Sequence, residues 1–128
     1  MNIKRFEDLE IWQESRKLSK VVFDITSVGP FSTYFRFRDQ MRASAGSVMD
    51  NIAEGFERDG NKEFNPFLSV SKGSTAEVRS QSYRAYDFSY INQDNLDELL
   101  ERNDSISRKT FNLMQHLKKS EINGLKYT

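Results

Sequence analysis

The sequence has no cysteine, only two prolines and six glycines, and a single histidine among its 128 residues. Without cysteine, the chain can form neither disulfides nor thiolate metal sites. The one histidine, His116, cannot build a multi-histidine metal centre or supply much acid–base chemistry alone. So few glycines and prolines leave little material for the many turns of an all-β domain. These absences predict an all-α protein that is not an enzyme and needs no metal or cofactor.

Long apolar runs and an excess of one charge are missing as well. A membrane-spanning helix needs about 20 consecutive apolar residues, and the sequence offers no such run. Four of the first eight residues are charged, and the segment carries no apolar stretch of the signal-peptide type, so we expect a cytoplasmic protein without membrane contact. The 19 basic and 19 acidic residues cancel, which excludes a protein that coats nucleic acid through bulk charge alone.

The apolar residues that are present recur at steps of three and four, which is typical of amphipathic helices. We expect four helices, at residues 7–26, 36–58, 62–90 and 92–119, in one domain that spans residues 1–128. Four amphipathic helices with short connections bury their apolar faces most simply as an antiparallel up-down-up-down four-helix bundle. The sequence therefore predicts the all-α class and this bundle.

Further expectations concern the ends and the packing of these helices. Pro30 should end the first helix because it lacks an amide donor, and residues 31–35 should form a linker. Asn61 should cap the third helix, and residues 120–128 should be a frayed tail. Small residues around Gly46 predict close approach of a neighbouring helix, which would offset the roughly 1 kcal/mol that glycine costs there.

The middle of the chain carries an ordered set of motifs between Gln40 and Gln81. They read Gln40, Arg42, Ser47 and Val48, then Asn51-Ile52-Ala53-Glu54-Gly55, then Glu63-Phe64 and Phe67-Leu68, then Gly73-Ser74 and Glu77. In this order they resemble the 23S rRNA-intervening-sequence protein family. The opening, Phe6 to Gln13, is similar to the start of the family pattern. The resemblance extends from Phe6 to about Leu117.

This resemblance implies a bacterial protein whose up-down bundle assembles into a ring-like homopentamer. Family members are encoded within insertions in bacterial 23S rRNA genes or elsewhere in genomes. A related branch, the accessory proteins of diversity-generating retroelements, works with a reverse transcriptase and binds nucleic acid through a basic surface. The implied partners are thus further copies of the chain, RNA or DNA, and a reverse transcriptase or other protein. The chain departs from the pattern at Ala43, where arginine is common, which removes one positive charge.

Basic residues gather at the start of the second expected helix and near its end. Arg38 and Arg42 are four residues apart, share a helix face, and have Phe35 and Phe37 close by in sequence. A ring of subunits would multiply a few arginines into a basic band, so zero net charge still permits local polyanion binding. The expected nucleic-acid-binding residues are Arg36, Arg38, Arg42, Arg58 and Lys62.

An alternative interpretation of these basic residues is that they are solvated or form ion pairs between subunits. Asp39, Asp50 and Glu57 are interleaved with them and could neutralise them. Tyr83, Tyr86 and Tyr90 share one side of the third expected helix and predict a protomer interface, with base stacking as the other option. Phe88 is expected in the core.

The polar residues of the motifs are interpreted as structural. Asn51 and Glu54 lie three residues apart on one side of a helix, but no nucleophile or metal is available to work with them. Glu63 and Glu77 could pair with arginines across helices. Di-metal bundles need Glu-x-x-His pairs on facing helices, and these are missing, so we expect no metal site. The expected structural residues are Gln40, Ser47, Asn51, Glu54, Gly55, Glu63, Phe64, Phe67, Gly73, Ser74 and Glu77.

The sequence therefore predicts a non-enzymatic, self-assembling four-helix bundle. Its expected role is that of an accessory or interaction protein that binds nucleic acid, or a nucleic-acid enzyme, through a basic patch. The alternative is a purely structural protein–protein assembly module with no nucleic-acid role. The salt dependence of binding separates the two, because counterion release accompanies only the binding of a polyanion.

Overall fold

The computed structural model describes residues 3–58 and 60–122, and no strand is present among them. A short 3₁₀ turn, η1, covers Phe6–Asp8. The helices are α1 (Glu10–Ile25), α2 (Gly29–Thr33), α3 (Phe35–Phe56), α4 (Asn61–Asp87) and α5 (Gln93–Ile122). None of the helices that these residues form is long and apolar enough to cross a membrane.

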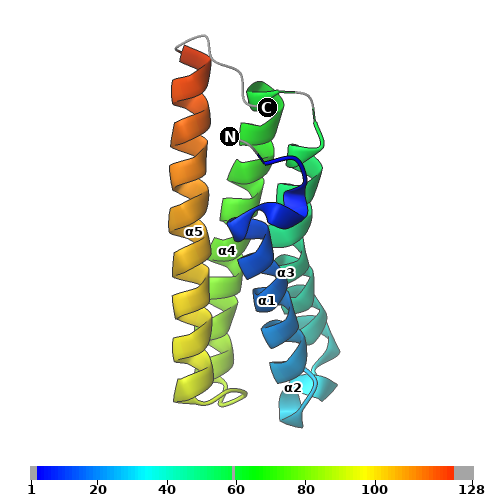
Figure 1. Ribbon diagram of the computed structural model, residues 1–128. Helices are drawn as coiled ribbons and strands as arrows, with labels where there is room; N and C mark the ends of the chain where they lie inside the picture. The colour runs from blue at the N-terminus through cyan, green and yellow to red at the C-terminus, as the bar shows by residue number, and fades with distance from the viewer. Residues whose placement is uncertain (1–2, 59, 123–128) are drawn as a thin grey trace.

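The four long helices lie side by side, and successive ones run in opposite directions (Figure 1). Contacts join α1 to α3, α3 to α4, α4 to α5, and α5 back to α1. This closed arrangement confirms the all-α four-helix bundle. The short helix α2 lies at the end of the bundle where the chain passes from α1 to α3 (Figure 1).

The core runs along the bundle axis, and its residues come from the expected faces of α3, α4 and α5. The fully buried large side chains are Leu18, Val22, Phe31, Met41, Val48, Ile52, Phe64, Leu68, Val78, Leu99, Ile106 and Leu117. The apolar steps of three and four therefore identified three of the four buried faces correctly.

The apolar residues of the first expected helix predict a buried face made of Leu9, Trp12, Leu18, Val21, Val22 and Ile25. Of these, Trp12, Val21 and Ile25 are only half-buried, so the buried face of α1 matches this prediction only in part. Its members are Ile11, Ser15, Leu18 and Val22, and Thr26 just beyond the helix is buried as well. The hydroxyl of Ser15 donates a hydrogen bond to the carbonyl of Ile11 (2.6 Å), and that of Thr26 donates to the carbonyl of Val22 (2.7 Å). Bonds of this kind within the helix let a polar residue occupy a core position.

The connection between α1 and α3 is the largest departure from the expected helix boundaries. Residues 31–35 are not a linker, because Gly29–Thr33 form α2 and Phe35 already belongs to α3. Gly29 has a φ of 60°, which starts the new helix in a new direction. Pro30 then lies in the first turn, where its missing amide has no intrahelical partner to lose. Proline here begins a helix rather than only ending one.

The two ends of α4 differ by a few residues from the helix boundaries expected from the sequence. Gly60, with a φ of 86°, precedes α4, so Asn61 is its first residue and not its cap. α4 ends at Asp87, because Ser89 adopts a φ of 62° and the amide of Tyr90 bonds to the carbonyl of Ala85 (2.9 Å). This is a Schellman ending.

The last helix starts with a cap and runs further than expected. The side chain of Asn92 accepts a hydrogen bond from the amide of Asn95 (2.8 Å), and that of Asn95 accepts one from the amide of Asn92 (3.2 Å). This reciprocal pair satisfies two amides at the start of α5. The helix continues to Ile122, and Ser120 is buried, so the expected fraying at residue 120 is wrong. The remainder of the expected tail, residues 123–128, lies outside the described residues.

The close approach of helices occurs at Gly55, not at Gly46. A Cβ atom built on Gly46 would meet nothing within 4 Å, whereas one built on Gly55 would lie 2.5 Å from Cβ of Phe67 on α4. The small residues around Gly46 instead form a serine seam between α3 and α4. In the seam, Ser74 donates to the hydroxyl of Ser47 (2.9 Å), and Ser71 donates to the carbonyl of Val48 (2.7 Å).

Helices α1 and α5 are joined by a small polar cluster. Lys109 donates to Glu14 (2.8 Å) and also to Glu10, and Ser105 donates to Glu14 (2.6 Å). Partial burial by itself would raise the pKa of Glu14, but the hydrogen bonds from Lys109 and Ser105 outweigh it and hold the pKa below its ordinary value. The ionised carboxylate of Glu14 therefore stabilises the fold.

We expect Glu14→Gln to lower the free energy of unfolding at pH 7 by about 1 kcal/mol, because the cluster is only partly buried. The carboxyl binds protons more readily in the unfolded chain. The native protein should therefore lose this contribution as the pH falls through and below the ordinary glutamate range. Urea unfolding between pH 7 and pH 3 measures both effects. The exposed Glu101, replaced by glutamine, is the control, and equal behaviour of the two variants would contradict the prediction.

Candidate nucleic-acid interface

The five basic residues expected to bind nucleic acid are not brought together. Arg36, Arg38 and Arg42 lie in the first turns of α3, whereas Arg58 and Lys62 lie around the connection that follows its other end. The 22 residues of α3 span about 33 Å at 1.5 Å per residue. The structure therefore places the expected residues at opposite ends of the bundle.

Arg42 makes contacts within the subunit. Its guanidinium donates to the hydroxyls of Thr26 (2.8 Å) and Ser27 (2.9 Å) and lies 4.4 Å from the ring centroid of Phe23. These contacts fasten the start of α3 to the end of α1. Arg42 thus has a structural role that its position in the sequence did not reveal.

Arg38 and its neighbours form an exposed surface that we call the arginine–aromatic end. Arg38 pairs with Asp39 (2.9 Å), donates to the carbonyl of Ser32 (3.0 Å) and lies 4.7 Å from the ring centroid of Phe35. Besides Arg38, Phe35 and the adjacent Arg36, the surface includes Tyr34, Arg84 and Phe88, which lie around the ring of Phe37 (6.0, 4.2 and 6.1 Å from its centroid). Phe35 is 61% exposed and Phe88 is 49% exposed, so Phe88 is not the core residue that the sequence suggested.

The expected tyrosine stripe on α4 is also incomplete. Tyr83 and Tyr86 are exposed on α4, but Tyr90 lies beyond the end of the helix. Its ring packs 5.3 Å from that of Phe31, measured between centroids, and is half-buried. Tyr90 therefore belongs to the packing around α2 and not to an outward-facing stripe.

At the other end of α3, the basic residues have local partners. Arg58 pairs with Glu54 (3.3 Å) and lies 5.1 Å from the ring centroid of Phe67. Lys62 is exposed in the first turn of α4. Glu54 is exposed as well, so its carboxylate is the partner of an arginine on the surface.

The remaining motif residues lie in or beside the contact between α3 and α4. Asn51 donates to the hydroxyl and to the carbonyl of Ser47 (both 2.9 Å), and the same hydroxyl receives the bond from Ser74. Phe64 is buried and Phe67 is half-buried beside Gly55. The exposed members of the set are Gln40, Glu63, Gly73 and Glu77.

Glu63 and Glu77 form no ion pair with the residues of the described ranges, contrary to the pairing suggested by the sequence. In those ranges no group of three or more histidine, aspartate or glutamate side chains is arranged to hold a metal ion. His116 is exposed near the end of α5.

A groove lined mainly by basic residues lies where α1 meets α5, and we call it the basic groove. It has a volume of about 810 Å³. Its lining residues are Arg5, Glu7, Trp12, Gln13, Arg16, Lys17, Lys20, Val21 and Arg102. Five of these side chains are cations and one is an anion. The ring of Trp12 is half-buried against Phe6, with 5.2 Å between centroids, and the guanidinium of Arg16 lies 5.7 Å from the Trp12 ring centroid.

The cations of the basic groove differ in how strongly they are compensated. Lys20 pairs with Asp24 (2.7 Å) and Arg102 with Glu98 (3.0 Å), each along its own helix. Arg16 and Lys17 form no ion pair with any residue that the structure describes. Lys17 nevertheless lies close enough to Glu14 for its charge to help lower the pKa of that carboxyl, so Arg16 is the less compensated of the two.

The sequence interpretation missed this groove for an identifiable reason. Arg16, Lys17 and Lys20 form a basic cluster within two turns of one helix, but they were not included among the expected nucleic-acid-binding residues. That spacing was the available signal. Arg102 comes from the other end of the chain, and only the contact between α1 and α5 brings it to the same groove.

The chain was also compared with known proteins. Residues 7–112 match the family model described as 23S rRNA-intervening sequence protein, which confirms the resemblance carried by the motifs. Comparison with curated proteins gives no match. The family is not known as an enzyme family. Because the match covers most of the chain, the protein belongs to the 23S rRNA-intervening sequence protein family.

Proposed function

We propose that the chain is a non-enzymatic, cytoplasmic bundle that self-associates and binds single-stranded nucleic acid in the basic groove. The observation that carries the proposal is the gathering of five cations and the half-buried Trp12 in one hollow. Cations track the phosphates of a strand, and an aromatic ring stacks on its bases. In this role the bundle is an accessory protein that holds a strand for a nucleic-acid enzyme such as a reverse transcriptase.

Zero net charge is compatible with this role. The field that a ligand meets depends on the charges that line the site, and the groove has five basic residues to one acidic residue, Glu7. The acidic partners Asp24 and Glu98 lie outside the lining. Self-association, as a homopentamer by family resemblance, would repeat the groove around a ring and raise the strength of binding to a long strand.

The second candidate function is a protein–protein assembly module with no nucleic-acid role. It is favoured by the arginine–aromatic end, where Phe35 and Phe88 are exposed and Phe35 lies against the guanidinium of Arg38. Aromatic residues and arginine are enriched at the centres of protein interfaces. Under this alternative the contact surface is the arginine–aromatic end, and the basic groove has no ligand.

Reversing the two groove charges that form no ion pair within the described residues, Arg16 and Lys17, tests the first function. In fluorescence anisotropy with a labelled single-stranded RNA, we expect the double variant Arg16→Glu, Lys17→Glu to bind at least about tenfold more weakly. The slope of log K against log salt should also flatten by about 1.4, because two phosphates of a single strand are then no longer neutralised. Light scattering on the same samples should give a multiple of the 15.0 kDa chain mass.

The matched control reverses two exposed lysines, Lys118 and Lys119, near the end of α5. This control has the same net charge as the groove variant, so a loss of affinity limited to the groove variant assigns binding to the groove. Equal loss in both would show only a response to net charge. Absence of salt-sensitive binding at about 50 mM salt would favour the assembly module. A monomer in light scattering would contradict self-association.

A further inference from the structure

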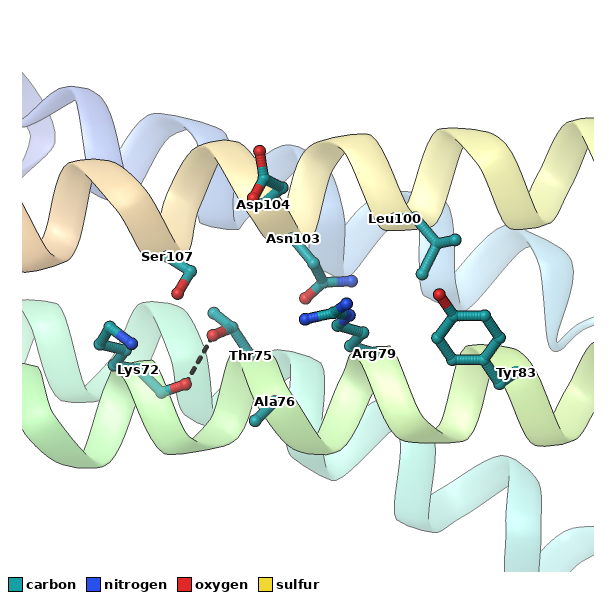
Figure 2. Close-up of a pocket in the computed structure, with 9 residues that line it drawn as sticks. All are labelled: Lys72, Thr75, Ala76, Arg79, Tyr83, Leu100, Asn103, Asp104 and Ser107. Atoms are coloured by element: carbon teal, nitrogen blue, oxygen red, sulfur yellow. Dashed lines mark hydrogen bonds between the residues drawn. The ribbon is translucent and has the colours of Figure 1, made fainter.

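A second groove lies between α4 and α5 and differs in character from the basic groove. It has a volume of about 370 Å³. Its lining residues are Lys72, Thr75, Ala76, Arg79, Tyr83, Leu100, Asn103, Asp104 and Ser107. Figure 2 shows the α4 and α5 side chains facing one another across it, with the Arg79 guanidinium and the Asn103 amide at its centre. We call it the α4–α5 groove.

Asn103 is the unusual residue of this groove. It is 2% exposed and takes a core position on α5 between Leu99 and Ile106, where an apolar side chain would pack. Its amide nitrogen donates to the carbonyl of Leu99 (2.8 Å), but its oxygen, Oδ1, has no hydrogen-bond partner among the described residues. A buried acceptor without a donor destabilises a fold, so the oxygen is suited to a donor from outside the chain.

The cations of the α4–α5 groove are available to a ligand. Arg79 is exposed and forms no hydrogen bond or ion pair with any part of the chain that the structure describes, so its guanidinium can turn without breaking one. Lys72 is half-buried and lies at the opposite end of the groove from Tyr83 (Figure 2). Asp104 is the only carboxylate in the lining, and it pairs with Arg108 (2.8 Å).

The chemistry changes along the α4–α5 groove. Lys72 and Ser107 lie at one end, Arg79 and Asn103 in the middle, and the Tyr83 ring faces Leu100 at the other end (Figure 2). A matching ligand has an anion for the cations, an N–H or O–H for the orphan oxygen, and a flat apolar part for the ring. Inorganic phosphate lacks the flat part, and an uncharged nucleoside lacks the anion.

We propose that the α4–α5 groove binds one nucleotide. Lys72 and Arg79 bind its phosphate, Asn103 Oδ1 accepts a hydrogen bond from its base or ribose, and Tyr83 packs against its base. Because the Arg79 guanidinium lies beside the Asn103 amide (Figure 2), the proposal requires Arg79 to turn toward the phosphate and open the buried oxygen to the ligand. A free nucleoside monophosphate and one residue of a single strand present the same chemistry. The inference is independent of the basic groove, which involves a different face of α5.

Isothermal titration of the full chain with the four nucleoside monophosphates tests this inference. We expect at least one to bind tenfold or more tightly than ribose 5-phosphate, inorganic phosphate or the matching nucleoside. Equal binding of ribose 5-phosphate would overturn the role of the base. The proposal is wrong if no monophosphate binds at millimolar concentration and substitutions in the α4–α5 groove also leave the affinity for the labelled RNA unchanged.

Two variants assign the site. Arg79→Gln removes an exposed cation and should weaken nucleotide binding at least tenfold, whereas the control Lys118→Gln, at an exposed position of α5 outside the groove, should leave it unchanged. Asn103→Leu should abolish binding yet raise the melting temperature, because the orphan acceptor is replaced by a core residue. A structural role for Asn103 predicts the opposite, a lower melting temperature with binding unchanged.

The same variants separate the two sources of nucleotide. If the groove holds one nucleotide of a longer strand, Asn103→Leu and Arg79→Gln should lower the affinity for the labelled RNA, even if free nucleotides bind poorly. If the ligand is a free nucleotide, RNA affinity should stay constant while nucleotide affinity falls. The double variant Arg16→Glu, Lys17→Glu should retain nucleotide binding in the second case, so failure of the basic groove and failure of the α4–α5 groove are distinguishable.

Discussion

Gly55→Ala is expected to destabilise the protein by about 1–3 kcal/mol, although alanine normally favours a helix over glycine by about 1 kcal/mol. The added Cβ would lie 2.5 Å from Cβ of Phe67 and 3.0 Å from Cδ1 of Phe64. Cβ of Phe67 is fixed to the backbone of α4, so a side-chain rotation cannot relieve the overlap. Helices α3 and α4 would have to move apart along the serine seam.

Gly46→Ala is the matched control, because it lies in the same helix and an added Cβ meets nothing within 4 Å. This variant should stabilise the protein by up to about 1 kcal/mol through helix propensity alone. Urea unfolding monitored by circular dichroism measures both. Opposite signs for the two glycines are the expected result, and a shift of both in the same direction would show that close packing is not the reason for Gly55.

Phe31→Ala is expected to cost about 3–5 kcal/mol, the range for removing a fully buried aromatic ring. Phe31 is 0% exposed, and its ring stacks on Phe37 with 4.9 Å between centroids and packs on Tyr90 at 5.3 Å. A five-residue helix is too short to be stable alone. The ring of Phe31 therefore holds α2 and the start of α3 in place.

The measurement is again urea unfolding, together with hydrogen exchange of the α2 amides. Those amides should lose protection before the amides in the centre of α4. Phe111→Ala serves as the control, since that ring is 48% exposed on α5 and its removal should change stability by no more than about 1 kcal/mol. A cost for Phe31→Ala as small as that of Phe111→Ala would mean that α2 is held by other contacts.

The steps of three and four predicted the buried faces of α3, α4 and α5, although these faces also hold polar residues such as Ser71, Ser82 and Asn103. They were less accurate for α1, where Ile11 and Ser15 are buried and Trp12 is only half-buried. A hydroxyl that bonds to a carbonyl of its own helix occupies the core without an apolar signature. Helix α2 was missed because five residues cannot show a period of 3.6. The end of α4 was missed because Ser89 takes a conformation usually reserved for glycine.

The candidate site was less predictable than the fold. Neighbours in sequence were grouped as one basic patch, but a helix of 22 residues carries Arg36 and Arg58 to opposite ends of the bundle. Arg42 looked like a free charge, and only the structure shows its bonds to Thr26 and Ser27. A sequence records which charges exist, whereas a groove depends on which helix faces meet, as for Arg16 and Arg102.

The aromatic packing around α2 has a consequence for how the bundle opens. The ring of Phe31 in α2 stacks on Phe37 in the first turn of α3 and packs on Tyr90 in the α4–α5 connection, so two of the three connections are joined at one end (Figure 1). At the opposite end only the α3–α4 connection links neighbouring helices. We therefore expect separation of the helices in partial unfolding to begin at this opposite end, where α5 ends, and to reach the end that carries α2 last.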